Sequence, residues 1–362
     1  MNTIIMWTLA VCAVLGGLDK ILGNRFGLGK RFDEGFELLG PLVSGMAGIL
    51  VLSPLMAKGL RAVISPLFIK IGIDPSVAAS LLAIDMGGYP LAMELGVDRR
   101  IALYSGIIAA STFGCTVSFT IPVGFSLADK RTSADFALGT MYGLITMPVG
   151  LLIGGAFCGL SVLETIWQSL PLMLLAVLMM VGIRLNTERM IRVFNVFAKF
   201  ISLLCVGGAV LGTFEYLTGA AIIPGLMPMK EAMTTAVMCG ITMLGSLPFM
   251  GIVTALLKKP LAALGAKLHM NDCGISSLVM NLVSITTCLA AVRKMDRRSV
   301  IVNAAFFVSA ADAFSSHLGF CAASEPALVS AQLAAKLSGG IAAAALSLVL
   351  TRNIKPEEEA AE

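Results

Sequence analysis

The stretch LLAIDMGGYPLAMELG, residues 81–96, decides how this chain folds. It lies in an apolar run that matches a membrane-spanning helix, which needs about 20 residues. Yet it carries Asp85, followed by Gly87, Gly88 and Pro90. Glycine and proline weaken a helix, and a carboxylate at membrane depth is costly unless it faces protein, water or a cation. The stretch therefore predicts an interrupted helix with an acid at the break.

Asp85 admits two interpretations. Backbone carbonyls freed at a break are tolerated in lipid only where they line a cavity or are buried in protein, so an acid beside them suits a cation-binding site. The alternative is a kinked packing helix in which Asp85 bonds to a neighbour. Glu94 lies near the end of the segment, where an interfacial charge explains it better than a binding role.

The composition is that of a membrane protein. Of the 362 residues, 57% are hydrophobic and only 13% are charged, and the mean hydropathy is +0.91. So few charges could not cover a soluble domain of this length, which excludes that class. The net charge of +4 indicates no nucleic-acid partner, because the basic residues lie in short connections where solvent and lipid headgroups explain them.

Apolar runs recur along the whole chain and predict an all-α integral membrane protein with about eleven transmembrane segments. A closed β-barrel would instead show short alternating strands. The expected segments are 3–22, 37–57, 75–96, 101–127, 134–160, 168–185, 198–217, 231–256, 272–292, 299–321 and 333–351.

The sequence also repeats itself at an offset of about 197 residues, as when DRR at 98–100 meets DRR at 296–298. This predicts two tandem homologous repeats of about five segments each, parallel or inverted. Two repeats are a common plan for secondary transporters, whose solute sites lie between them. The expected parts are a first membrane repeat (1–160), a linking transmembrane segment and loop (161–195), a second repeat (196–352) and a short polar tail (353–362).

Small residues and cysteines are interpreted as structural. The spacings Gly139-x3-Gly143 and Gly208-x3-Gly212 predict close contacts between helix backbones. The eight cysteines all lie in apolar segments, and none forms a C-x-x-C pair. They are expected to be small apolar filler rather than disulfides or metal ligands, and no metal or cofactor is expected.

A second set of polar residues lies in apolar segments of the second half. Asp312 lies well inside its segment, and Ser315 and Ser316 would share a helix face with it. His317 would suit a proton relay, although a histidine simply hydrogen-bonded within the bundle explains it equally well. Asp272 is a candidate for ion coupling, but it sits where a helix could begin, so capping competes.

Several catalytic classes are excluded. The chain has no G-x-x-x-x-G-K-[ST] loop, so it is not expected to pump with ATP. With two histidines, no H-E-x-x-H and no G-x-S-x-G, it carries no catalytic constellation and is not expected to be an enzyme. An intramembrane enzyme that uses Asp312 and His317 is a remote alternative.

Four stretches carry a resemblance to a known family: GLDKILGNRFGLGKRFDEGFELLGPL (17–42), AIDMGGYPLAMELG (83–96), HMNDCGISSLVMNLV (269–283) and VSAADAFSSHLGF (308–320). Over nearly its whole length the chain resembles the ethanolamine permease family of bacterial ethanolamine-utilisation systems. The resemblance implies a multi-pass protein of the bacterial cytoplasmic (inner) membrane. It also implies that the chain helps ethanolamine enter the cell and feeds a cobalamin-dependent ammonia-lyase pathway in a microcompartment.

This implied substrate fits the polar residues. Ethanolamine is mostly an ammonium ion at neutral pH, and Asp85 and Asp312 could replace its water shell. Tyr89, four residues from Asp85, could add a cation–π contact, although an ordinary packing role explains it equally well. The substrate hydroxyl needs donors and acceptors, which Asn281 and the Ser111/Thr112 region could supply.

The resulting expectation is a transporter that moves ethanolamine by alternating access between two repeats. Facilitated diffusion, H+ coupling and Na+ coupling all fit the residues. The rival functions are a cation-coupled carrier for another small amine or amino acid, and a channel. The sequence indicates neither an oligomeric partner nor an orientation in the membrane.

Overall fold

The computed structural model describes residues 2–82, 85–129 and 131–354, and every regular element in these ranges is helical. In chain order the elements are α1 (Asn2–Ile21), α2 (Leu28–Glu37), α3 (Leu39–Val63), α4 (Ser65–Lys70), α5 (Val77–Leu81), η1 (Asp85–Gly87), α6 (Gly88–Leu95), α7 (Arg99–Leu103), η2 (Tyr104–Gly114), η3 (Thr116–Thr120), α8 (Ile121–Leu127), α9 (Ser133–Phe157), α10 (Val162–Leu185), α11 (Thr187–Thr218), α12 (Met229–Leu268), α13 (Asp272–Met280), α14 (Ile285–Ala291), η4 (Val292–Lys294), α15 (Arg297–Ala310), α16 (Ser316–Ser324), η5 (Pro326–Leu328) and α17 (Val329–Leu350).

Eight stretches of the described residues are long and apolar enough to cross a membrane, judged by length and composition. They are Asn2–Ile21, Leu28–Val63, Arg99–Leu127, Ser133–Phe157, Val162–Leu185, Thr187–Thr218, Met229–Leu257 and Pro326–Leu350. The chain is therefore a multi-pass all-α membrane protein, as its hydropathy predicts.

The other three expected segments, 75–96, 272–292 and 299–321, are interrupted helices. Each consists of two short helices, which are α5 with α6, α13 with α14, and α15 with α16. In lipid such breaks require internal partners for the freed backbone groups. Two of the breaks partner each other, because the backbone N–H of Asp312 donates to the carbonyl oxygen of Asn281 at 2.9 Å.

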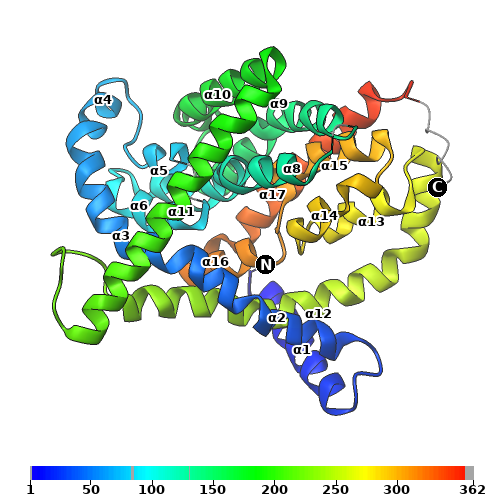
Figure 1. Cartoon of the computed structure of the whole chain (residues 1–362), viewed down its shortest axis with the longest axis horizontal. Coiled ribbons are helices and arrows are strands. Elements are labelled where there is room, and N and C mark those ends of the chain that lie inside the picture. Colours follow the sequence, from blue (N-terminus) through cyan, green and yellow to red (C-terminus); the bar gives the residue numbers. More distant parts are fainter. Residues whose placement is uncertain (1, 83–84, 130, 355–362) are drawn as a thin grey trace.

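Helices α9, α15 and α17 pack together at the centre of the molecule (Figure 1). Small residues let their backbones approach. A Cβ on Gly139 would lie 2.2 Å from the Ile301 carbonyl oxygen of α15, and one on Gly150 would lie 2.5 Å from the Ala335 carbonyl oxygen of α17. The close contact expected at Gly139 is thus confirmed.

Long helices flank this core. Helix α12 runs along one side of the molecule, where it contacts α1, α2, α3 and α16, and α11 crosses α3 (Figure 1). The crossing is tight, because a Cβ on Gly208 would lie 2.0 Å from the Gly48 carbonyl oxygen. Only 11% of the apolar 18-residue stretch of α11 is buried against the rest of the protein, as expected of a helix that faces lipid.

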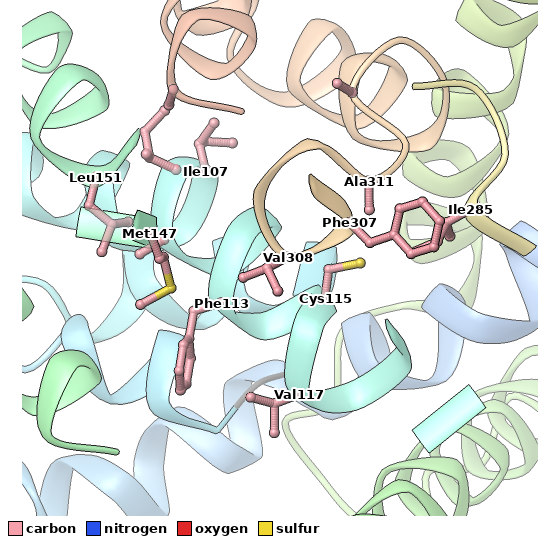
Figure 2. Close-up of a cluster of buried hydrophobic side chains, with 14 of the residues drawn as sticks. Ile107, Phe113, Cys115, Val117, Met147, Leu151, Ile285, Phe307, Val308 and Ala311 are labelled. Carbon is pink, nitrogen blue, oxygen red and sulfur yellow. The ribbon is translucent and has the colours of Figure 1, made fainter. Parts of the chain in front are cut away.

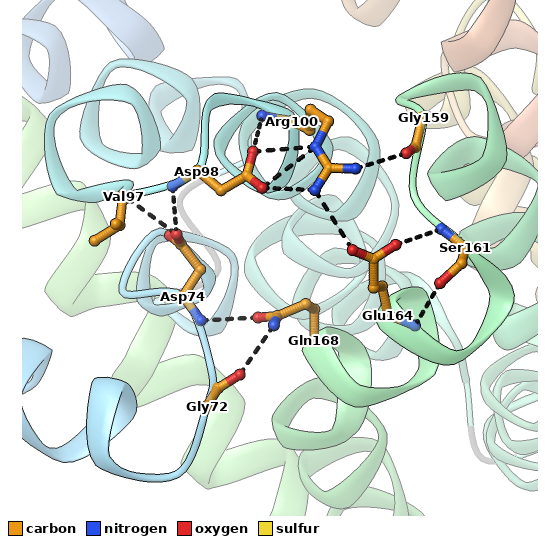
Figure 3. Close-up of polar contacts among 9 residues, drawn as sticks. All are labelled: Gly72, Asp74, Val97, Asp98, Arg100, Gly159, Ser161, Glu164 and Gln168. Atoms are coloured by element: carbon orange, nitrogen blue, oxygen red, sulfur yellow. Dashed lines mark hydrogen bonds and ion pairs between the residues drawn. The ribbon is translucent and has the colours of Figure 1, made fainter.

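A network of hydrogen bonds and ion pairs fixes the N-terminal end of α7 (Figure 3). The Asp74 carboxylate accepts from the backbone N–H groups of Val97 at 3.0 Å and Asp98 at 2.8 Å. The side-chain oxygen of Gln168 on α10 accepts from the Asp74 N–H at 2.8 Å. Arg100 donates to the Asp98 carboxylate and lowers the pKa of that carboxyl below its usual value. These bonds fix where α7 begins and hence where the following π-helix η2 lies.

A large apolar cluster fills the space behind the breaks (Figure 2). It includes Phe113 and Cys115 of the π-helical region, Met147 of α9 and Phe307 of α15. All four are at most 3% exposed. This packing fixes the positions of the interrupted helices relative to α9 and α15.

Candidate functional site

The centre of the candidate site is a contact between two interrupted helices. Asp85 lies at the break between α5 and α6, and its Oδ1 is 2.8 Å from Nε2 of His317 on α16. The His317 side chain is 1% exposed and that of Asp85 is 22% exposed. Asp85 has a φ of 55°, a left-handed conformation that aspartate tolerates better than most residues. The structure therefore brings together the two residues predicted for substrate binding and for proton coupling.

The partners of His317 determine where a proton lies. Its Nδ1 is 3.0 Å from the carbonyl oxygen of Ala311, which can only accept, so Nδ1 must carry a hydrogen. Nε2 then faces a carboxylate oxygen, which is also an acceptor when ionised. A second hydrogen must therefore lie between Nε2 and Oδ1, whichever of the two atoms owns it. The pair holds one proton that another cation could replace.

Asp312 lies at the second central break and also has a left-handed backbone, with a φ of 52°. Its Oδ1 accepts from the backbone N–H of Ile285 at 2.9 Å. The expectation that Asp312, Ser315 and Ser316 share a helix face is wrong, because residues 311–315 form turns between α15 and α16. The N–H groups of Asp312 and Phe314 donate instead to carbonyl oxygens of the 281–284 break, and this pairing ends the helix.

A cavity of about 530 Å³ opens at these breaks. One side is formed by α3 and α11, and the other by η1, the η2–η3 junction and the start of α16. Asp85, Cys115, Asp312 and Ser316 line it. The two predicted substrate carboxylates thus share one cavity between the core and its flanking helices.

Lys336 of α17 is a buried basic residue that is absent from the predicted site. It is 1% exposed, and its Nζ donates to the carbonyl oxygen of Ser111 at 2.6 Å. It also interacts electrostatically with Asp85 and Asp312. A lone lysine within the apolar segment 333–351 is the signal that could have found it, by the same rule that found Asp85.

Asn281 is fully buried at the 281–284 break, and its backbone carbonyl accepts from Asp312. Neither Oδ1 nor Nδ2 of its side chain has a hydrogen-bond partner among the described residues. A buried amide without partners costs free energy, so it indicates a place for water or a polar ligand.

Tyr89 does not reach the cavity. Its hydroxyl donates to Oε1 of Glu325 at 2.9 Å, and its ring packs edge-on against Phe320 at a centroid distance of 5.8 Å. Arg99 donates to the same Glu325 oxygen at 2.9 Å. The chain turns at Asp85, so residues four apart do not lie on one helix face, and Tyr89 points to a polar cluster instead.

Ser111 and Thr112 are buried in the π-helix η2, but their hydroxyl groups are already used. Both hydroxyls donate to the carbonyl oxygen of Ile108, at 3.3 Å and 2.8 Å respectively. Ser111 contributes through its backbone instead, because its carbonyl oxygen accepts from Lys336.

Asp272 lies apart from the other predicted residues. It is the exposed first residue of α13, where Asn271 is the N-cap and accepts from the Gly274 N–H at 2.9 Å. It lines a separate surface cavity with Arg31 of α2.

The predicted helix break needs one correction. α5 ends at Leu81, residues 83–84 lie outside the described part of the chain, and α6 already begins at Gly88. Pro90 therefore sits in the first turn of α6, where its missing N–H costs nothing. Gly88 serves close packing, since a Cβ there would lie 3.1 Å from the Ala110 side chain.

One further coincidence of side chains concerns metals. A carboxylate oxygen of Asp85, the Sγ of Cys115 and a ring nitrogen of His317 all lie within 4.8 Å of one another. These are one oxygen, one sulfur and one nitrogen donor, and Cys115 and His317 are buried.

Comparison with known proteins identifies relatives along the full length. The family described as "Ethanolamine utilisation protein, EutH" matches residues 1–350. The chain is 35% identical to "Probable ethanolamine permease EutH" of Listeria monocytogenes serotype 1/2a (strain 10403S), over 100% of this chain and 97% of that protein. It is 32% identical to the protein of the same name from Escherichia coli (strain K12), over 99% and 97%. It is 36% identical to "Uncharacterized protein YxeR" of Bacillus subtilis (strain 168), over 97% and 95%. No solved structure matches the chain.

Proposed function

The chain belongs to the EutH family of ethanolamine utilisation proteins, and from this premise we propose that it takes up ethanolamine through the bacterial cytoplasmic membrane as the ammonium form. The family and the names of the relatives support a permease rather than an enzyme, one that feeds ethanolamine catabolism.

The Asp85–His317 pair at the wall of the cavity carries the proposal. Ethanolamine is a primary amine, which is largely protonated at neutral pH, as the side chain of lysine is. Its ammonium group has three donors. If the shared proton leaves, Nε2 and Oδ1 are two acceptors 2.8 Å apart with nothing between them. One ammonium group donating to both would replace that proton.

The charges of the site support this exchange. With Asp312 ionised and Lys336 protonated, the two charges cancel, and the proton-bound Asp85–His317 pair is neutral overall. Loss of the shared proton leaves one net negative charge, which one substrate ammonium neutralises. Buried charge is tolerated only when balanced, so the site accepts either a proton or a substrate at a time. The proposed coupling is therefore exchange of one proton for one ethanolammonium ion.

The hydroxyl end of the substrate would bind at Asn281, which is fully buried and is not among the residues that line the cavity. Asn281 offers an unpaired amide that can donate to and accept from a hydroxyl group. It is joined to Asp312 through the backbone, so both would respond to the same ligand. Leaving that amide unpaired is costly, which favours a substrate with a hydroxyl over a simple alkylamine.

The two-repeat plan is also proposed, with a first repeat over 1–160, a link over 161–195, a second repeat over 196–352 and a tail over 353–362. The order of elements supports it, since α5, α6 and α7 are followed later by α13, α14 and α15. Their first residues are 77 and 272, 88 and 285, and 99 and 297, which differ by 195, 197 and 198. Eight candidate spans together with three interrupted segments are compatible with the eleven segments that this plan proposes.

Uptake of labelled ethanolamine tests the proposal. We would compare Asp85→Asn with the wild type in cells that lack their own ethanolamine permease, at low micromolar substrate and matched membrane abundance. A hydrogen bond to a charged group is worth about 1.5–3 kcal/mol, so we expect the variant to lose uptake by about ten-fold or more. Glu94→Gln is the matched control, because Glu94 lies outside the cavity and its change should have little effect.

Two results would count against the proposal. Uptake that survives in Asp85→Asn would remove Asp85 from the substrate path. Absence of protein-dependent uptake in the wild type would contradict ethanolamine itself as the substrate.

A further inference from the structure

Cys115, Asp85 and His317 converge from three different elements. Cys115 lies at the junction of η2 and η3, Asp85 at the break before α6, and His317 near the start of α16. Their donor atoms lie within 4.8 Å of one another. Cys115 is 3% exposed and belongs to the buried cluster drawn in Figure 2, yet it also lines the 530 Å³ cavity. The thiol is therefore shielded from bulk solvent but borders the space through which the proposed substrate passes.

We propose that these three side chains form an inhibitory site for a borderline-soft divalent ion of the Zn²⁺ class. Zn²⁺ prefers tetrahedral sets of thiolate, imidazole and carboxylate donors at about 2.0–2.3 Å, and three protein ligands with one open position is a recurrent arrangement. Tetrahedral donors at those distances lie about 3.3–3.8 Å apart. Donors now within 4.8 Å therefore need only small side-chain shifts. The cavity supplies the fourth position.

The second contact of His317 supports this assignment. A histidine that binds a metal usually donates its other ring N–H to a carbonyl or carboxylate, which fixes the ring and the tautomer. Nδ1 of His317 already does so to the Ala311 carbonyl at 3.0 Å. Nε2 is thereby directed at the position where the ion would lie. The ion would displace the hydrogen shared with Asp85.

The binding step balances in protons and charge. One divalent ion forms bonds to Nε2 of His317, a carboxylate oxygen of Asp85 and the thiolate sulfur of Cys115. Two protons leave, which are the one shared by His317 and Asp85 and the one on the Cys115 thiol. The net charge of the site is unchanged, so the charge balance with Asp312 and Lys336 is kept. Hard ions such as Mg²⁺ prefer all-oxygen sites and should not compete.

Binding at this position would block transport, a consequence that rests on the proposed function, because the ion takes the two acceptors assigned to the substrate ammonium. The Cys115 thiol makes it possible to separate metal binding from substrate binding. Cys115 is not among the proposed substrate contacts, but without its sulfur only Asp85 and His317 remain as ligands for the ion.

The test uses the purified full-length protein in proteoliposomes. Ethanolamine uptake is titrated with ZnCl₂ and then with EDTA, for the wild type, Cys115→Ser and Cys273→Ser. The last is a matched control on α13, outside the cavity. Each variant is compared with its own metal-free uptake. We expect Zn²⁺ to inhibit the wild type and Cys273→Ser alike, with recovery in EDTA. Cys115→Ser should need at least about ten-fold more Zn²⁺, because even outer-shell partners are worth 10–100-fold in metal affinity.

A second measurement is independent of transport. Co²⁺ added to the protein in detergent should give thiolate-to-cobalt absorption in the wild type and Cys273→Ser, but not in Cys115→Ser. Equal Zn²⁺ sensitivity of the wild type and Cys115→Ser, or a cobalt spectrum without a thiolate band in the wild type, would overturn the site. If the liposomes show no ethanolamine uptake, the proposed function fails, and the cobalt spectra still decide whether the metal site exists.

Discussion

Lys336 is the residue whose position most constrains the chemistry of the site. Nearly complete burial deprives its ammonium group of water, and a single described hydrogen bond, to the Ser111 carbonyl, does not satisfy three donors. It interacts electrostatically with Asp85 and Asp312, and in the proposed charge balance the Asp312 carboxylate offsets its charge. In the proposed charge balance, Lys336 supplies the protein's own cation, and this leaves room for only one more positive charge.

Replacing that built-in cation should change which ions the site needs. In Lys336→Met we expect ethanolamine uptake in sodium-free buffer to fall by about ten-fold or more, since hydrogen bonds to charged groups are worth about 1.5–3 kcal/mol. Added Na⁺ should restore part of it, because the site would then carry one more negative charge. Uptake of labelled ethanolamine with and without NaCl measures both effects. Lys267→Met, at an exposed position of α12, is the control.

A Lys336→Met variant that transports normally in either buffer would show that the lysine charge is not part of the balance. A variant whose loss is unaffected by Na⁺, at matched abundance, would assign Lys336 to packing alone.

At this scale, ionisable residues in apolar segments are predictable and their neighbours are not. Asp85, Asp312 and His317 stand out because lipid penalises such groups, and the structure places all three together. Helical periodicity predicts Tyr89 on the same face as Asp85, but the left-handed backbone at Asp85 removes that periodicity. Cys115 reads as apolar filler in sequence, and only the fold reveals that two donors lie close to it.

At the scale of elements, α7 shows how a charged cap positions the cavity wall. Asp98 caps α7 by accepting from the Arg100 N–H at 2.8 Å, and Asp74 holds Asp98 in turn (Figure 3). The π-helix η2, which carries Ser111 and precedes Cys115, continues directly from α7. Loss of the cap should therefore lower the free energy of unfolding and also disturb the position of η2 in the cavity wall.

Asp98→Ala should lower the free energy of unfolding by about 1 kcal/mol at neutral pH, the usual value of an N-cap. Because the Arg100 pair lowers the folded-state pKa of Asp98, its stabilisation is present above the ordinary carboxyl pKa of about 3.9 and is lost as the pH falls through the folded-state value. The difference in Tm between wild type and Asp98→Ala in detergent should thus shrink below about pH 4.

Asp98→Asn serves as the comparison, since it keeps a capping oxygen but has no charge to titrate. Its Tm difference from Asp98→Ala should be independent of pH in this range. A wild-type advantage over Asp98→Ala that persists undiminished at acid pH would argue against the charged pair.

Interrupted helices are only partly visible in sequence. The first break is marked by Gly87, Gly88 and Pro90, although the helix has already ended at Leu81. The breaks at 281–284 and 311–315 contain neither glycine nor proline. They form because their backbone groups bond to each other across the fold, as Asp312 does to Asn281 and Phe314 to Leu282. Such tertiary pairing has no local signature, so the prediction of interrupted helices could be assigned to a position only at Gly87, Gly88 and Pro90.

At the scale of the whole molecule, the cavity separates two parts of the structure. Helices α3 and α11, tightly crossed at Gly48 and Gly208, form one wall, and the interrupted helices held by α9, α15 and α17 form the other. A site at such a boundary can open to either side if one part moves against the other, as in transporters built from repeats. Close backbone contacts at small residues, such as Gly48 with Gly208 and Gly139 with Ile301, would keep each part rigid in such a movement.

Exchange of one proton for one ethanolammonium ion moves no net charge across the membrane. We therefore expect uptake into proteoliposomes to be insensitive to a membrane potential set with K⁺ and valinomycin. A pH gradient with the acid side inside should accelerate it, because outward protons drive inward substrate. The initial rate of labelled ethanolamine uptake, at fixed external pH so that the amount of ammonium form is constant, measures both effects.

Protein-free liposomes control for passive entry of the neutral amine, which an inside-acid gradient also traps, so only the saturable, protein-dependent rate is compared. Asp85→Asn should lose that component under every gradient. A potential of 100 mV is worth about 2.3 kcal/mol per elementary charge, so a uniporter or channel for the ammonium ion would respond by tens of times. Strong acceleration by an inside-negative potential would contradict proton exchange at the Asp85–His317 pair. A protein-dependent rate driven by the pH gradient alone would instead tie the single shared proton of that pair to the transport cycle of the whole molecule.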